Sequence, residues 1–444
     1  MPRLELAAPL FALALLTRAA DARVPAFVRQ TGLTCSQCHV SWTTAPDFTF
    51  TGMRFRLNGY RLPRVTEVGA GPEGAIGHEE LEQTLARMLS ARARSTLVYK
   101  TKAPGDPTLE PPTAGPAVSN LIGPIDGYIT GPIGEHVGLW SDFCGYGGRD
   151  VSIPAFEETT CVRSDGYIGL SDLSAQISTI ANDNVFGLAG TVVKAGRAPR
   201  FMTMTPATAP NHQPYAPGIE GGGYAYTLYG LYAFLADRVG VKIGVEPGEG
   251  DQNFKRFNYR FEGGVFALNS DAGWLQLGWT LRAGNDMTPI VAGVPGVTAL
   301  TKGQLGYTGE SAGRARRAMY SVGYGFTDRG PHSFVATANL SLETDEYTDG
   351  GSSRLRATGT NLRYCFQRKY GVDAYVYGFP KWEYTDPTGV THPIPENTGV
   401  MGRLMYSPGL NLTLYIEGAN TQSARLDQDW RQGSYWSVNA QFLW

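Results

Sequence analysis

Apolar and polar residues alternate with a period of two along most of the chain beyond residue 90. In 239–246, for example, the valines and Ile243 lie on one face, and Lys242 and Glu246 lie on the other. This alternation predicts β-strands with two chemically different faces. Sixteen segments show it: 90–101, 119–131, 135–143, 163–176, 186–196, 223–236, 238–247, 256–268, 272–283, 316–327, 331–343, 353–366, 369–380, 397–407, 409–420 and 432–444. We therefore expect an all-β chain of 16 antiparallel strands, with 14 to 18 as the range.

The links between these segments alternate in length. Links after even-numbered segments are mostly tight, as at 236–238, whereas those after odd-numbered segments are mostly long, as at 197–222 and 284–315. Outer-membrane barrels have short periplasmic turns and long external loops. The final residue, Trp444, lies on the apolar face and resembles the closing strand of such barrels. The pattern predicts a porin-like transmembrane β-barrel over 89–444, with both ends of the barrel in the periplasm.

Composition narrows the functional classes. The 38 basic and 40 acidic residues nearly cancel, and this gives no support to a nucleic-acid partner, which needs clustered positive charge. No apolar run approaches the roughly 18 residues of a membrane-spanning helix. A barrel of 16 strands leaves an aqueous lumen. The side chains expected to face it are polar and of mixed sign: Arg92, Arg94, Lys242, Glu246, Arg260, Glu262, Arg282 and Glu417.

The N-terminus has the pattern of an export signal. Arg3 precedes an apolar stretch over 7–16, and small residues at 20–22 form an A-x-A site. This pattern predicts a signal peptide over 1–22, cleaved after Ala22, with a buried N-terminal helix as the alternative. An exported chain can carry covalently attached haem and disulfide bonds.

The run Cys35-Ser36-Gln37-Cys38-His39 is a C-x-x-C-H motif, the attachment sequence for c-type haem. Two thiols at this spacing can each bond one vinyl group of a haem, and the following imidazole can bind the iron. The motif predicts one covalent haem c, attached at Cys35 and Cys38, with His39 as an iron ligand. A zinc half-site and a redox-active cysteine pair are the alternatives.

The sixth position on the iron has several candidates. Met53 lies 14 residues beyond His39, and His78 and Met88 are its competitors. Met53 as iron ligand, Met53 as packing against the porphyrin, and an open or water-ligated iron all remain possible. We expect 23–88 to form a monohaem cytochrome c module, with one short helix over 79–89. Because the module is too small for a large core of its own, we expect it at or inside the periplasmic mouth of the barrel.

The remaining cysteines and histidines are dispersed along the strand region. Cys144 and Cys161 flank a predicted external loop and are candidate disulfide partners, whereas Cys365 stands in a strand without an assigned role. The histidines of this region show no metal-ligand spacing; they are His136, His212, His332 and His392. His212 and His392 fall in predicted outer loops.

The N-terminal motifs resemble those of the fused outer-membrane cytochrome–porins of iron-oxidising bacteria. The resemblance covers about 24–62 and consists of Pro25-Ala26-Phe27, the C-x-x-C-H run at 35–39, Phe55, and Asn58-Gly59-Tyr60. It implies a monohaem cytochrome joined to a porin, which accepts electrons from extracellular Fe(II) and passes them to a periplasmic cytochrome or another electron carrier. Members of that family usually have Arg where Met53 stands, so Met53 as ligand is an inference from this chain alone.

Three functional hypotheses follow. The first is an electron-transfer oxidoreductase of the outer membrane with Fe(II), or another extracellular reductant, as its donor. The second is a diffusion porin in which the haem is structural or acts as a gate. The third is a soluble periplasmic cytochrome with a β domain.

Overall fold

The structure is a computed structural model, and it describes part of the chain. The described residues are 27, 33, 35–39, 49–61, 88–100, 115–119, 125–133, 136–144, 169–181, 184–194, 229–247, 257–284, 314–347, 350–393, 398–409, 412–422 and 433–443. They include the helices α3 (Cys35–Cys38) and α4 (Phe50–Leu57). Among these residues no helix is both long and apolar enough to cross a membrane.

The remaining described elements are strands. Their bounds are β1 (Leu89–Lys100), β2 (Gly115–Ser119), β3 (Ile125–Ile133), β4 (Val137–Cys144), β5 (Gly169–Ala181), β6 (Asn184–Lys194), β7 (Tyr229–Leu235), β8 (Val239–Pro247), β9 (Phe257–Ser270), β10 (Gly273–Gly284), β11 (Arg314–Arg329), β12 (His332–Glu346), β13 (Ser352–Phe366), β14 (Tyr370–Thr385), β15 (Thr391–Pro393), β16 (Thr398–Gly409), β17 (Leu412–Gln422) and β18 (Gly433–Leu443).

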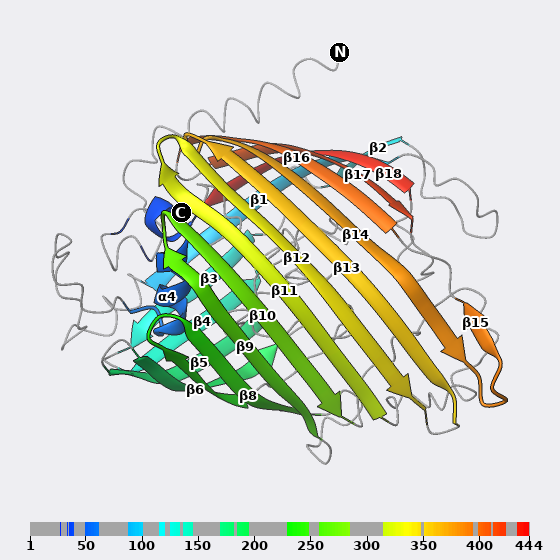
Figure 1. Ribbon diagram of the computed structural model, residues 1–444. Coiled ribbons are helices and arrows are strands. Elements are labelled where there is room, and N and C mark those ends of the chain that lie inside the picture. The colour runs from blue at the N-terminus through cyan, green and yellow to red at the C-terminus, as the bar shows by residue number, and fades with distance from the viewer. Residues whose placement is uncertain are drawn as a thin grey trace.

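All of these strands belong to one antiparallel sheet of 18 strands. From β3 to β14 each strand pairs with the next one in the chain, and the same holds from β16 to β18. The first strand, β1, pairs with β18 along one edge and with β2 and β3 along the other. The sheet therefore curls round, as Figure 1 shows.

Each of the 16 predicted segments overlaps a strand, and the described sheet has 18 strands, within the predicted range of 14 to 18 and two more than the segments. The additional ones are short. β2 and β3 pair with successive parts of β1, and β15 and β16 pair with successive parts of β14. Hydrophobic alternation reports which way side chains point and does not detect where backbone pairing is interrupted. For this reason the sequence predicted one segment, 119–131, where the structure has β2 and β3.

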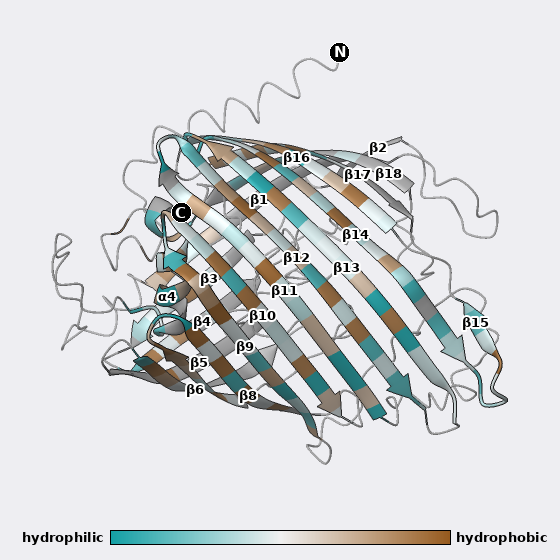
Figure 2. Ribbon diagram, in the orientation of Figure 1, coloured by the Kyte–Doolittle hydropathy of each residue, from teal (hydrophilic) through white to brown (hydrophobic). Residues whose placement is uncertain are grey.

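The two faces of the sheet differ as predicted. Outward-facing apolar side chains are exposed, for example Leu231 at 67% and Ile243 at 65%, whereas inward-facing Lys242 and Glu262 are 2% and 0% exposed. Along the strands, hydrophobic and hydrophilic residues alternate (Figure 2). An exposed apolar outer face and a polar inner face are the arrangement of a sheet whose outside meets lipid. The side chains of Arg92, Arg94 and Glu246, also predicted to face inward, lie outside the described residues.

The tight turns lie together at one end of the sheet. They join β3 to β4, β5 to β6, β7 to β8, β9 to β10, β11 to β12, β13 to β14, and β16 to β17. Because Arg92 of β1 pairs with Leu443 of β18, the first strand begins and the last strand ends at this same end. The short connections named above thus share one end of the sheet, as predicted, and α4 contacts this tight-turn end.

Candidate functional site

The C-x-x-C-H motif forms the one-turn helix α3, and His39 follows it directly. The side chains of Cys38 and His39 are half-buried, and Cys38 forms no disulfide bond within the described part of the chain. The side chain of Cys35 lies outside the described residues. These residues contain no cluster of three or more His, Cys, Asp or Glu side chains that could hold a metal ion.

Thr49 fastens the motif helix to the start of α4. Its backbone N–H donates to the carbonyl of Cys38 (3.0 Å), and its hydroxyl donates to the carbonyl of Gln37 (2.6 Å). The same hydroxyl accepts from the N–H of Gly52 (3.0 Å), the geometry of a helix N-cap. A Cβ on Gly52 would lie 2.1 Å from the carbonyl oxygen of Cys38. The close approach of the two helices therefore requires glycine at this position.

The C-terminus of α4 is closed by Asn58-Gly59-Tyr60. Gly59 and Tyr60 have φ of 71° and 61°, and the N–H of Tyr60 donates to the carbonyl of Phe55 (2.9 Å). This is a Schellman cap, which is typically accompanied by an apolar contact between the same two residues. The rings of Phe55 and Tyr60 lie 5.9 Å apart, and Phe27 stacks on Tyr60 at 5.1 Å. Three aromatic residues of the N-terminal resemblance thus form one cluster.

The apolar side of α4 packs against the inner face of the sheet near the tight turns. The buried cluster comprises Phe50, Phe55, Tyr60, Val185, Tyr232, Phe234 and Phe266. The rings of Phe50 and Phe266 meet edge to face at 5.3 Å. Met53 contacts this cluster and a second one, formed by Trp274 and Val335. The inner wall from β6 to β12 is therefore apolar where α4 rests on it.

Polar contacts from three tight turns hold α4 and His39 against the sheet. In the β7–β8 turn, Asp237 forms an ion pair with Arg54 of α4 (2.7 Å). In the β9–β10 turn, the carboxylate of Asp271 accepts from the backbone N–H and the hydroxyl of Thr51 (3.1 and 2.7 Å). In the β13–β14 turn, Nη1 of Arg368 donates to the carbonyl of His39 (3.3 Å). The segment is thus joined to turns that are distant from one another along the chain.

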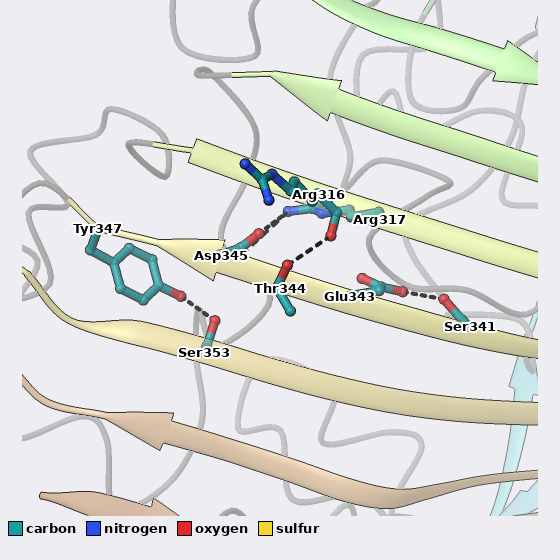
Figure 3. A network of polar contacts seen from close by, with 8 residues as sticks. All are labelled: Arg316, Arg317, Ser341, Glu343, Thr344, Asp345, Tyr347 and Ser353. Atoms are coloured by element: carbon teal, nitrogen blue, oxygen red, sulfur yellow. Dashed lines mark hydrogen bonds and ion pairs between the residues drawn. The ribbon is translucent and has the colours of Figure 1, made fainter. Parts of the chain in front are cut away.

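The inner wall also carries charged side chains that pair across neighbouring strands. Among the described residues the pairs include Lys242–Glu262 (3.9 Å), Arg317–Asp345 (3.2 Å), Arg403–Glu417 (2.8 Å) and Arg363–Asp373. Figure 3 shows Arg317 and Asp345 beside hydrogen bonds from Ser341 to Glu343 and between Tyr347 and Ser353. Burial, and after it the carboxylate of Asp345, raises the pKa of Tyr347 well above its ordinary value. Opposite charges therefore compensate one another on this wall.

The structure brings together only part of the predicted haem module. The motif helix, His39 and the helix that carries Met53 lie against one another, and the side chain of Met53 packs among apolar groups. Met88, one competitor for the sixth position, is fully buried where β1 begins. The other, His78, and most of the predicted helix over 79–89 lie outside the described residues.

The remaining cysteines and histidines are far from the motif helix in the sequence. Cys365 is buried in β13, whereas the side chain of Cys144 and the whole of Cys161 lie outside the described residues. His136 is exposed at the start of β4. His332 shares a hydrogen bond with Tyr364 (2.6 Å), and His392 shares one with Asp386 (3.0 Å), both at the surface. His212 lies outside the description.

Sequence reasoning missed the residues that hold the motif to the sheet. Thr49 was detectable, because a threonine at the start of an apolar run is a helix-start signal. A tight turn was predicted at 236–238, but nothing in its sequence indicates that Asp237 contacts α4. The same is true of Asp271 and Arg368, whose partners lie far away in the chain.

Neither a protein-family model nor a curated protein matches the chain. Solved structures do. OprB of Pseudomonas putida matches with a TM-score of 0.50 at 10% identity, over 80% of this chain and 94% of its own. The outer-membrane channel DcaP of Acinetobacter baumannii matches at 0.47 and 11%, over 80% and 96%. OmpT of Vibrio cholerae matches at 0.44 and 12%, over 80% and 98%. The chain has a porin-like fold of antiparallel strands; identities this low carry no information on activity.

Proposed function

We propose that the protein is an outer-membrane cytochrome–porin that transfers electrons from an extracellular donor, with Fe(II) favoured, through one haem to periplasmic carriers. The observation that carries the proposal is the position of the C-x-x-C-H motif. It lies on a helix whose partner, α4, packs into the tight-turn end of a porin-like sheet. This contact supports a proposal in which the C-x-x-C-H motif and the porin-like sheet act together.

The donor set of the motif fits a single c-type haem. Cys38 is directly followed by His39, and the motif spacing supplies Cys35 as the second attachment point. A haem bound there supplies a one-electron carrier. The chain's own residues hold the motif in place: Thr49 bonds its backbone, and Arg368 bonds the carbonyl of His39.

In this proposal the sheet forms a barrel with sixteen strand positions around its circumference. β1 pairs with β18 and with β3, β2 extends the β3 position, and β15 extends the β16 position. The tight-turn end would face the periplasm, as in outer-membrane barrels generally. A haem at that end would be within reach of periplasmic carriers, and the donor would approach through the lumen from the long-loop side.

The test is the reduction of the haem by Fe(II) in intact cells. The chain is produced in a host that matures c-type cytochromes, and the spectrum is followed by stopped flow after Fe(II) is added outside. The proposal predicts that, after Fe(II) is added, the spectrum changes to that of the reduced haem. Reduction by dithionite is the positive control. Reduction by dithionite but not by Fe(II) would remove iron as the donor and leave the cytochrome.

A diffusion porin with a structural or gating haem is the second candidate, and the porin-like sheet itself favours it. Conductance in planar bilayers separates the two. A large steady ion current through the haem-loaded protein supports the porin. A closed or nearly closed channel supports electron transfer.

A further inference from the structure

Two tight turns of the sheet have a backbone conformation that their residues disfavour. Ala236 and Asp237 have φ of 48° and 54°, and Gln367 and Arg368 have φ of 50° and 56°. Each pair occupies the two central positions of a four-residue β-turn, closed by a hydrogen bond from Arg238 to Leu235 (2.9 Å) in one turn and from Lys369 to Phe366 (3.1 Å) in the other. Hairpins of this geometry normally use Asn-Gly or Asp-Gly, because both central residues need positive φ.

In each turn the second residue contacts the N-terminal segment, which we define as the motif residues 35–39 together with 49–61. Asp237 contacts Arg54 of α4, and Arg368 contacts the carbonyl of His39. Of the five non-glycine residues with positive φ in the described part of the chain, four belong to these two turns. In the β11–β12 turn the residue with positive φ is a glycine, Gly330, with φ of 63°.

A disfavoured backbone conformation that persists at a contact indicates that the side chain is needed there. Glycine would relieve the conformation in both turns, but it would remove the carboxylate or the guanidinium that reaches the segment. Of the two contacts, that of Arg368 acts on the residue predicted to bind iron. It fixes the main chain from which the imidazole of His39 projects and places a positive charge beside it.

We propose that Arg368 is a positioning residue for the axial ligand His39, and that Asp237 has the same role for α4; this inference rests on the proposed function. Fixing the His39 carbonyl limits the orientations of its side chain. A nearby cation also favours the more electron-rich state of a redox centre. Loss of the guanidinium is therefore expected to lower the reduction potential of the bound haem.

The test compares Arg368→Gly with the matched control Gln367→Gly in the full-length, haem-loaded protein. Both changes relieve a positive φ in the same turn, but only the first removes the contact to His39. Arg368→Lys keeps the positive charge but replaces the guanidinium with an ammonium group as the hydrogen-bond donor. Two quantities are measured: the reduction potential, and the amide hydrogen exchange of peptides that cover 35–39 and 49–61.

We expect Arg368→Gly to lower the potential and to speed exchange of the segment about fivefold, the effect of one lost hydrogen bond. Gln367→Gly should match the wild type, and Arg368→Lys should recover most of the potential. Equal behaviour of the two glycine variants would overturn the proposal. If the wild type carries no haem, the proposed function fails, while the exchange comparison still decides whether Arg368 holds the segment.

Discussion

Gly52→Ala is the sharpest perturbation of the site, because the atoms it would displace are backbone atoms. The added Cβ would lie 2.1 Å from the carbonyl oxygen of Cys38 and 2.9 Å from its carbonyl carbon. Side-chain rotation cannot relieve such a contact, so α3 and α4 must move apart by about 1 Å. The 3.0 Å bond from Thr49 to Cys38 and the 2.6 Å bond from Thr49 to Gln37 would then exceed or approach the limit of a hydrogen bond.

The expected cost follows from these two bonds. Each contributes about 1 kcal/mol, while alanine gains about 1 kcal/mol over glycine in a helix interior. Because the packing between the two helices also weakens as they separate, we expect a net destabilisation of about 1 to 2 kcal/mol. This destabilisation corresponds to roughly 5- to 30-fold more frequent opening of the segment.

Hydrogen exchange followed by mass spectrometry on the folded, detergent-solubilised protein measures this opening directly. Peptides over 35–39 and 49–60 should exchange faster in Gly52→Ala, whereas strands distant from α4 should not change. Gly402→Ala is the control, because its Cβ would meet only the carbonyl oxygen of Asp373, at 3.9 Å. Unchanged exchange of the segment in Gly52→Ala would refute the close packing of the two helices.

Three further predictions concern other parts of the molecule. Glu417→Ala should destabilise the folded state by about 3–5 kcal/mol in denaturant titrations, because it removes the ion-pair partner of buried Arg403. A hydrogen bond from His392 holds the pKa of Asp386 well below its usual range. The ionised carboxylate of Asp386 therefore stabilises the β14–β15 hairpin at neutral pH, and this stabilisation is lost as the pH falls below about 4. Amide exchange rates of the hairpin measured in acid will detect the loss. Met53→Ala should change the spectrum of bound haem if Met53 ligates iron, and otherwise should only lower stability, since Met53 packs in two apolar clusters.

The strands and their two faces could be predicted from sequence because both depend on local patterns. In 256–268 and 272–283 every second side chain is apolar, and the structure places those side chains outward and Arg260, Glu262 and Arg282 inward. Turn positions such as 236–238 were equally local. The start and end of α4 were not predicted, because its sequence, FTGMRFRL, has no clear polar face.

The attachment of the motif to the sheet could not be predicted, because its contacts join residues far apart in the chain. Thr51 and Asp271 are 220 residues apart, and His39 and Arg368 are 329 apart. Nothing in the local sequence of a turn records which distant group it will meet. The spacing of the motif predicts its chemistry locally, whereas its place in the fold depends on three-dimensional packing.

We propose that this porin-like protein carries one covalent haem in the outer membrane. The most direct measurement is the intact mass of the protein purified from the outer-membrane fraction of a host that matures c-type cytochromes. We expect a mass increase equal to one haem, which is absent from a variant with serine at both Cys35 and Cys38. A chain that is folded in that membrane but has the mass of the bare polypeptide would contradict it.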